Sequence, residues 1–203
     1  MKIDYQLAEQ WIQPNARVLD LGCGDGSMLA YLTQKLNIFG YGIELDQEKI
    51  NDCIAKGVNV VEQDLNDGLS RFADQSFDTV VMARALQAVD APDQLLLDML
   101  RVGREVIVTF PNFAHWQNRI HLGIKGMMPM SEALPFAWYN TPNIHLCTFN
   151  DFEKLCEEHD IHIINRFAVQ ESEERYPTLL AKFVKLNPNL LADVAIYRVT
   201  KQD

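Results

Sequence analysis

The stretch VLDLGCGDG, Val18–Gly26, joins a short apolar run to three glycines that are spaced two residues apart. The run Arg17–Leu21 predicts a buried strand, and the apolar residues that follow it recur with the 3.6-residue period of a helix over Ser27–Leu36. Glycine tolerates positive φ and lets a ligand approach the main chain, while the helix directs N–H groups toward that ligand. The stretch therefore predicts a loop that cradles a polar or anionic group, with a purely structural turn as the alternative.

Strands and helices alternate along the rest of the chain. Further strands are expected at Gly40–Leu45, Val58–Gln63, Phe77–Ala83, Glu105–Phe110, Ile161–Val169 and Asp193–Thr200. Helices are expected at Asp4–Gln13, Asp46–Ala55, Pro92–Leu100 and Asp151–His159. Such alternation produces a parallel sheet, but little room for a crossover helix precedes the last strand. We therefore expect one domain over residues 1–203, an α/β fold with a doubly wound, seven-stranded, mostly parallel sheet and an antiparallel last strand.

Two acidic residues follow the glycines at the ends of the next two strands. Glu44 lies twenty positions after Gly24, where a carboxylate can accept both hydroxyls of a ribose. Asp64 ends the third strand, where it can accept from an adenine amino group; a solvated strand end for Glu44 and a turn or cap for Asp64 are the alternatives. The series Gly22, Gly24, Ser27 departs from the G-x-G-x-x-G of dinucleotide sites. The pattern favours a nucleoside without a pyrophosphate.

Composition excludes several other classes. Of the 203 residues 48% are hydrophobic, but no apolar run approaches the roughly 18 residues of a membrane span, and the start resembles no export signal. The four cysteines have no CxxC spacing, and His159 and His162 have no further ligands at a familiar spacing. We therefore expect a cytoplasmic protein with reduced thiols, no metal and no membrane partner.

The motifs VLDLGCGDG, GIELD, QDL and SFDTVVMARAL resemble motifs one to four of class I S-adenosylmethionine-dependent methyltransferases. The resemblance implies a Rossmann-like fold in which Asp20 and the backbone of Gly22–Gly24 hold the methionine part of the cofactor. It also implies that Glu44 binds the ribose and that Asp64 and the Leu65 amide bind the adenine. Ala83 and Arg84 would border the methyl donor. For Asp20, tying down its own turn is the alternative. The full candidate set for S-adenosylmethionine or S-adenosylhomocysteine is Asp20, Gly22, Gly24, Glu44, Leu45, Asp64, Leu65, Ala83 and Arg84.

The second half is very similar to the methionine-biosynthesis family MetW, through RVGREVIVTFPNF, MPMSEALPFAWYNTPNIHLCT and DFEKL. Two departures are Met127, where a basic residue is usual, and Arg84, where an uncharged polar residue is expected. The resemblance implies a cytoplasmic protein that associates with a homoserine O-acyltransferase and supports its activity. It does not establish methyl transfer. The absence of an N-P-P-Y motif argues against N-methylation of a base or glutamine, and the absence of a Pro-Cys pair argues against cytosine C5 chemistry. Methyl transfer to a nucleophilic small molecule needs neither motif.

Two functions therefore remain: an activating subunit with an S-adenosylmethionine-type pocket, which we favour, and an active methyltransferase on an unidentified small molecule. No catalytic residue is assigned. His115, His121 and His145 have the right chemistry for a general base, although such histidines more often serve structure.

An insertion over about 113–149 is expected to form either a lid over the pocket or an interface. It is rich in large apolar residues: Trp116, Met127, Met128, Met130, Phe136, Trp138 and Tyr139. Trp138 and Tyr139 have the chemistry to shield a sulfonium by cation–π contact, although core or lid packing is the commoner role of such residues.

The formal net charge of −10 predicts that the protein has no useful affinity for duplex DNA at physiological salt, because that affinity depends on Lys and Arg at the phosphates. Fluorescence anisotropy of a labelled duplex should stay flat up to micromolar protein. Submicromolar binding that weakens with added salt would contradict the prediction.

Overall fold

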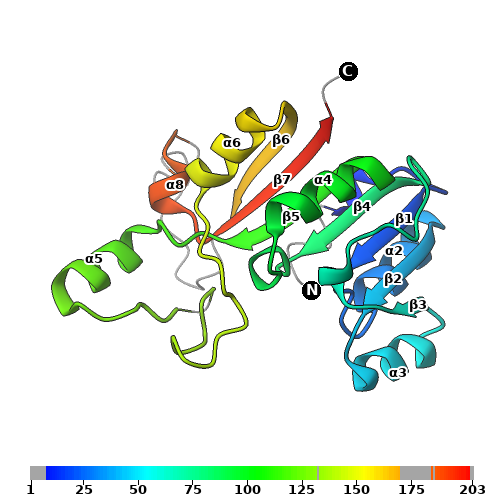
Figure 1. The fold of residues 1–203 in the computed structure, drawn as a ribbon, viewed down its shortest axis with the longest axis horizontal. Helices are drawn as coiled ribbons and strands as arrows, with labels where there is room; N and C mark the ends of the chain where they lie inside the picture. The colour runs from blue at the N-terminus through cyan, green and yellow to red at the C-terminus, as the bar shows by residue number, and fades with distance from the viewer. Residues whose placement is uncertain (1–7, 132, 170–183, 185, 202–203) are drawn as a thin grey trace.

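One seven-stranded sheet organises the molecule, with strand order β3-β2-β1-β4-β5-β7-β6 (Figure 1). The computed structural model describes residues 8–131, 133–169, 184 and 186–201. The strands are β1 (Arg17–Leu21), β2 (Phe39–Glu44), β3 (Asn59–Glu62), β4 (Phe77–Ala83), β5 (Gly103–Pro111), β6 (Ile161–Val169) and β7 (Val194–Lys201). The predicted bounds of β1, β4 and β6 are confirmed, and the other four strands differ by one or two residues at an end.

The direction of the strands agrees with the expectation from the sequence. β3, β2, β1, β4 and β5 run parallel to their neighbours. β7 inserts between β5 and β6 and is antiparallel to both. The doubly wound, mostly parallel α/β fold with an antiparallel last strand is therefore confirmed.

Helices cover both faces of the sheet. On one face, α4 (Pro92–Val102) and α6 (Phe149–Glu158) contribute Leu96 and Phe152 to the larger apolar core. On the other face, α2 (Ser27–Leu36) contributes Leu29 and Leu32 to a second core, together with Trp11 from the helical residues 8–11. The start of the predicted helix Asp4–Gln13 lies outside the described residues. β4 is buried along nearly its whole length because it contributes side chains to both apolar cores.

The helix bounds follow from capping. α3 (Gln47–Ala55) begins after Asp46, whose Oδ1 accepts from the Glu48 and Lys49 N–H groups, as the sequence predicts. The predicted start of α6 at Asp151 was wrong by two residues. Thr148 caps the helix, and Asp151 instead occupies the third helical position of a capping box, where its Oδ2 accepts from the Thr148 N–H at 3.1 Å.

The chain leaves the sheet after β5 and returns only at α6 (Figure 1). We call residues 113–148 the arm. It begins with α5 (Trp116–Lys125) and continues as a long irregular segment. Three short elements complete the fold: the 3₁₀ turns η1 (Leu65–Asp67) and η2 (Leu86–Ala88), and α8 (Pro188–Leu191). In the described part of the chain, no helix has the length and apolar character needed to cross a membrane.

Candidate functional site

The predicted site residues gather at one edge of the sheet, which we call the rim. The parallel register pairs Leu21 of β1 with Ile43 of β2, and Asp20 of β1 with Val81 of β4. The carboxyl ends of these strands therefore meet. The chain winds from β1 toward β2 and β3 on one side and toward β4 on the other, and ligands of open α/β sheets bind at such a reversal.

The glycine loop follows β1 at this reversal. Gly22, Gly24 and Gly26 have φ values of 70°, 58° and 71°, a region that other residues rarely adopt. A Cβ on Gly22 would lie 3.3 Å from the Ala85 Cβ, so this glycine lets the loop after β4 approach closely. A Cβ on Gly24 would meet nothing within 4 Å. The loop therefore turns an open, side-chain-free surface outward at Gly24.

Glu44 holds this loop in place. Its Oε2 accepts from the Gly24 N–H at 2.9 Å, and its Oε1 accepts from the N–H groups of Leu45 at 2.9 Å and Asp46 at 3.1 Å. A carboxylate offers about four acceptor positions, so these main-chain bonds use most of them. Glu44 is thus part of the loop's own structure, a role that its position in the sequence did not reveal.

Asp20 lies at the end of β1, beneath the loop, with only 2% of its surface exposed. Its Oδ1 is buried and has no hydrogen-bond partner. Burial raises the pKa of the Asp20 carboxyl to about 7, and the negative charge of Glu44 adds to the rise. A buried oxygen without a hydrogen-bond donor is uncommon and points to a missing partner. The alternative role for Asp20 was to fix its own turn by a hydrogen bond, and Oδ1 makes no such bond.

Asp64 and Leu65 form the corner after β3. The Asp64 Oδ1 accepts from the Asn66 N–H at 2.9 Å, so Asp64 caps η1, which is the structural role that the sequence left open. The Asn66 Oδ1 accepts from the Asp90 N–H at 2.9 Å, and the Asp90 carbonyl lies 3.2 Å from the His145 Nε2 of the arm. This corner is therefore bonded to the loop after β4 and, through it, to the arm.

Ala83 ends β4, and Arg84 follows with a φ of 59°. The Arg84 N–H donates to the Thr109 carbonyl at 2.9 Å. A positive φ in a residue other than glycine, asparagine or aspartate is uncommon, and such strain often accompanies functional sites. Thr109 pairs with Ala83 in the sheet and has a buried Oγ1 without a partner. Thr109 was not among the residues predicted from the sequence. The signal that could have identified this residue is its polar side chain within the apolar run EVIVTF.

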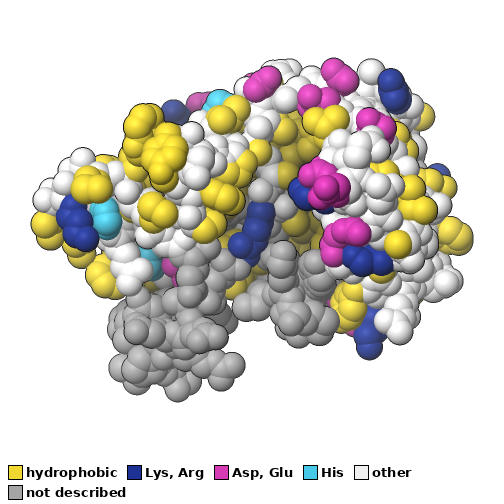
Figure 2. Space-filling model, turned by 90° about the horizontal axis from the view of Figure 1, so that it is seen from below, with side chains coloured by type: hydrophobic (Ala, Val, Ile, Leu, Met, Phe, Trp, Pro, Cys, Tyr) yellow, Lys and Arg dark blue, Asp and Glu magenta, His cyan; other side chains and the backbone are white. Residues whose placement is uncertain are grey.

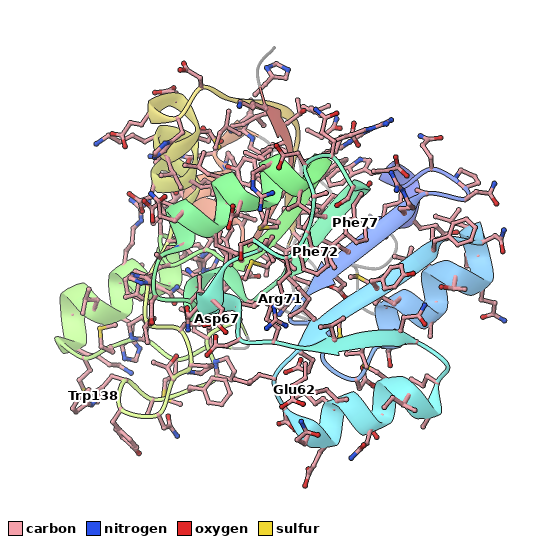
Figure 3. The ribbon with its side chains drawn as sticks, turned by 45° about the vertical axis from the view of Figure 1, so that its right-hand side comes forward. Glu62, Asp67, Arg71, Phe72, Phe77 and Trp138 are labelled. Carbon is pink, nitrogen blue, oxygen red and sulfur yellow. The ribbon has the colours of Figure 1, made fainter. Side chains whose placement is uncertain are left out.

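The candidate residues of the arm lie in different surroundings. His115 is buried with its Nε2 3.6 Å from the Asp193 Oδ1, and burial lowers its pKa despite the opposing effect of Asp193. Trp138 and Tyr139 are largely exposed. In Figure 3, Trp138 lies on the arm and is separated in this view from Glu62 and Asp67, which lie near the rim. Within the described residues, no three His, Cys, Asp or Glu side chains are grouped to hold a metal.

Comparison with solved structures assigns this architecture to the class I S-adenosylmethionine-dependent methyltransferase fold. An S-adenosylmethionine-dependent methyltransferase from Mesorhizobium loti aligns with a TM-score of 0.69 and 13% identity, over 96% of this chain and 95% of that chain. The [4+2]-cyclase SpnF aligns with a TM-score of 0.65 and 17% identity, over 97% and 80% of the two chains. The fold is thus clear, whereas the reaction differs among proteins that share it.

The family follows from sequence. The model of "Methionine biosynthesis protein MetW" matches residues 2–199, and the chain belongs to this family. A curated relative from Rhodopirellula baltica, the bifunctional methionine biosynthesis protein MetXA/MetW, is 34% identical over 97% of this chain. The chain spans 32% of that relative's length. The predicted family membership is therefore confirmed.

Asp20→Asn should stabilise the protein more at pH 8 than at pH 5. The folded state holds the Asp20 proton up to about pH 7, whereas the unfolded chain releases it near pH 4, so stability falls as pH rises between these values. Asn cannot ionise, so the increase in the free energy of unfolding caused by Asp20→Asn should be roughly 2–3 kcal/mol larger at pH 8 than at pH 5. Urea unfolding at the two pH values measures it.

Asp25→Asn is the matched control in the same loop. Hydrogen bonds from Lys56, with a contribution from Ser27, lower the pKa of Asp25 to about 2, so its stabilising effect is constant between pH 5 and pH 8. An Asp20→Asn effect of equal size at the two pH values would contradict the raised pKa.

Proposed function

We propose that the rim binds S-adenosylmethionine or S-adenosylhomocysteine and that the protein supports a homoserine O-acyltransferase in methionine synthesis. The observation that carries the second part is the Rhodopirellula baltica relative, whose name assigns MetXA and MetW to one chain. Two activities that are fused in one organism commonly act together when they are separate chains. We further propose a cytoplasmic location, which the four free cysteines support, since reducing conditions preserve thiols.

The chemistry of the rim fits an adenosyl cofactor with a methionine part. The ammonium of that part is the kind of donor that the buried Asp20 Oδ1 lacks, and a nearby positive charge would keep Asp20 ionised at neutral pH. The open surface at Gly24 accommodates the ligand close to the main chain. Asp20 and the backbone of Gly22–Gly24 would therefore hold the methionine part.

The remaining residues fit the nucleoside. Glu44 would accept from the ribose with the acceptor capacity that its main-chain bonds leave, and the exposed Leu45 beside it would contribute an apolar contact. Asp64 and the Leu65 amide would bind the adenine. Ala83 and Arg84 would border the sulfonium. When bound, the cofactor supplies an electrophilic methyl group.

A supporting role is favoured over catalysis because the name of the Rhodopirellula baltica relative joins MetW to MetXA in one chain. The second candidate function is methyl transfer to a small molecule, which the unpartnered Thr109 Oγ1 beside Ala83 favours as a polar contact for an acceptor. A nucleophilic acceptor needs mainly alignment with the donor, so this reaction requires no dedicated base.

Glu44→Gln should weaken S-adenosylmethionine binding at least about tenfold, because an amide nitrogen cannot accept from a hydroxyl or from the Gly24 N–H. Calorimetry with S-adenosylmethionine and with S-adenosylhomocysteine measures the dissociation constants. Glu158→Gln, which removes the same charge at the end of α6, should leave both unchanged. Equal affinity of the folded Glu44→Gln protein would remove this residue from the site.

Purified homoserine O-acyltransferase from the same organism should gain activity when this protein is added. Acylation of homoserine is followed as thiol release from the acyl-CoA donor, with bovine serum albumin as the protein control. No change in rate at saturating protein, together with transfer of label from methyl-labelled S-adenosylmethionine to a metabolite extract, would favour the methyltransferase instead.

A further inference from the structure

The helix α5 presents its apolar side chains to solvent. Of the ten residues of α5 only Asn118 is buried, and the Asn118 Nδ2 donates to the Phe113 carbonyl at 3.2 Å. Ile120 and Ile124, four positions apart and therefore on one side of the helix, are both exposed, and 80% of the Ile124 surface is accessible. α4 shows the usual arrangement, with Leu95, Leu96 and Met99 buried in the core. The apolar side of α5 is thus not used by the protein's own core.

Exposed apolar residues continue along the arm beyond α5. We call this set of residues the arm face, and it consists of Ile120, Leu122, Ile124, Met127, Met128, Met130, Phe136, Trp138, Tyr139, Ile144 and Leu146. Trp138 and Tyr139 are 75% and 74% exposed, and their rings pack edge to face with centroids 5.8 Å apart. Figure 2 shows hydrophobic side chains gathered over this end of the molecule.

Polar contacts, rather than the arm face, hold the arm in position. The Phe113 N–H donates to the Cys147 carbonyl at 3.0 Å and joins the two ends of the arm. The Asn112 Nδ2 donates to the carbonyls of Asn189 and Ala192, and the His145 N–H donates to the Gln87 carbonyl. Hydrogen bonds therefore fix the two ends of the arm. Leu134 of the arm is buried, whereas the side chains of the arm face are exposed and available for another molecule.

The composition of the arm face matches a protein interface. Interface cores are enriched in Trp, Tyr, Phe and Met and depleted in charge. Between Ile120 and Leu146 the sequence has only two charged residues, Lys125 and Glu132, in a chain with a net charge of −10. The stretch has 27 residues, which lies within the roughly 20–30 residues that each partner contributes to an interface of standard size.

We propose that the arm face is the surface that binds homoserine O-acyltransferase, with Ile124, Trp138 and Tyr139 as its main anchors. The inference rests on the proposed function. The fused relative favours this occupant over a second copy of the chain, because 97% of this chain aligns within a longer protein that also bears the name MetXA. Eleven of the 18 exposed large hydrophobic residues in the described part of the chain belong to the arm face.

The test is a titration of purified acyltransferase with the wild-type protein and with Ile124→Glu and Trp138→Glu, by biolayer interferometry. Both changes place a charge within the proposed interface, and each should weaken the affinity at least about tenfold. Ile54→Glu is the matched control, since Ile54 is 63% exposed on α3 and the substitution is the same. The affinity of the Ile54→Glu protein for the acyltransferase should stay within about twofold of the wild-type value.

Several outcomes would overturn the inference. Failure of the wild-type protein to bind the acyltransferase would overturn the proposed function together with this interface. Wild-type binding that Ile124→Glu, Trp138→Glu and Ile54→Glu all retain would overturn the interface alone.

Two further measurements separate the other occupants. Light scattering that shows a wild-type dimer, lost in Ile124→Glu with acyltransferase binding intact, would assign the arm face to self-association. Calorimetry that shows weakened S-adenosylmethionine binding with acyltransferase binding intact would make the arm a lid. Thermal melts establish that each variant is folded, and Ile124→Ser replaces Ile124→Glu if that variant is not.

Discussion

The bond between the Gly24 N–H and the Glu44 carboxylate sets the shape of the rim. The alternating glycines Gly22, Gly24 and Gly26 all adopt left-handed conformations in the loop after β1. Main-chain bonds hold the start of this loop, since the N–H groups of Gly22 and Cys23 donate to the Ile43 carbonyl, but a loop whose middle was free would still lose the entropy of many conformations on binding. Glu44 reaches across from β2 and fixes the middle of the loop at 2.9 Å. Asp20 then lies under a loop whose position is set, and the corner at Leu65 and Ala85 closes against Gly22.

Much of the fold was predictable because local patterns and tertiary packing agree. The apolar run of β4, the period of α2 and the Asp46 cap each predicted an element that the structure contains. The start of α6 was missed because Asp151 is itself a plausible cap, and only the reciprocal bonds with Thr148 reveal its true position. Local signals of similar strength can therefore shift a boundary without changing the topology.

The candidate site was less predictable than the fold. Sequence spacing indicated which residues come to the rim, because parallel strands end at a common edge. It could not indicate that Glu44 bonds the glycine loop, that Arg84 adopts a positive φ, or that Ala85 contacts Gly22. These features depend on contacts between loops that are distant in sequence, and no periodic pattern encodes such contacts.

The uncovered arm face has a colloidal consequence. Large apolar patches promote association, whereas a net charge far from zero keeps molecules apart. This chain combines the arm face with a net charge of −10, so like-charge repulsion opposes contact between arms at neutral pH. The repulsion fades as the pH approaches 4.9, where the net charge vanishes. The acidic composition thus has a second effect besides opposing contact with polyanions, since its like-charge repulsion opposes self-association through the exposed apolar arm face at neutral pH.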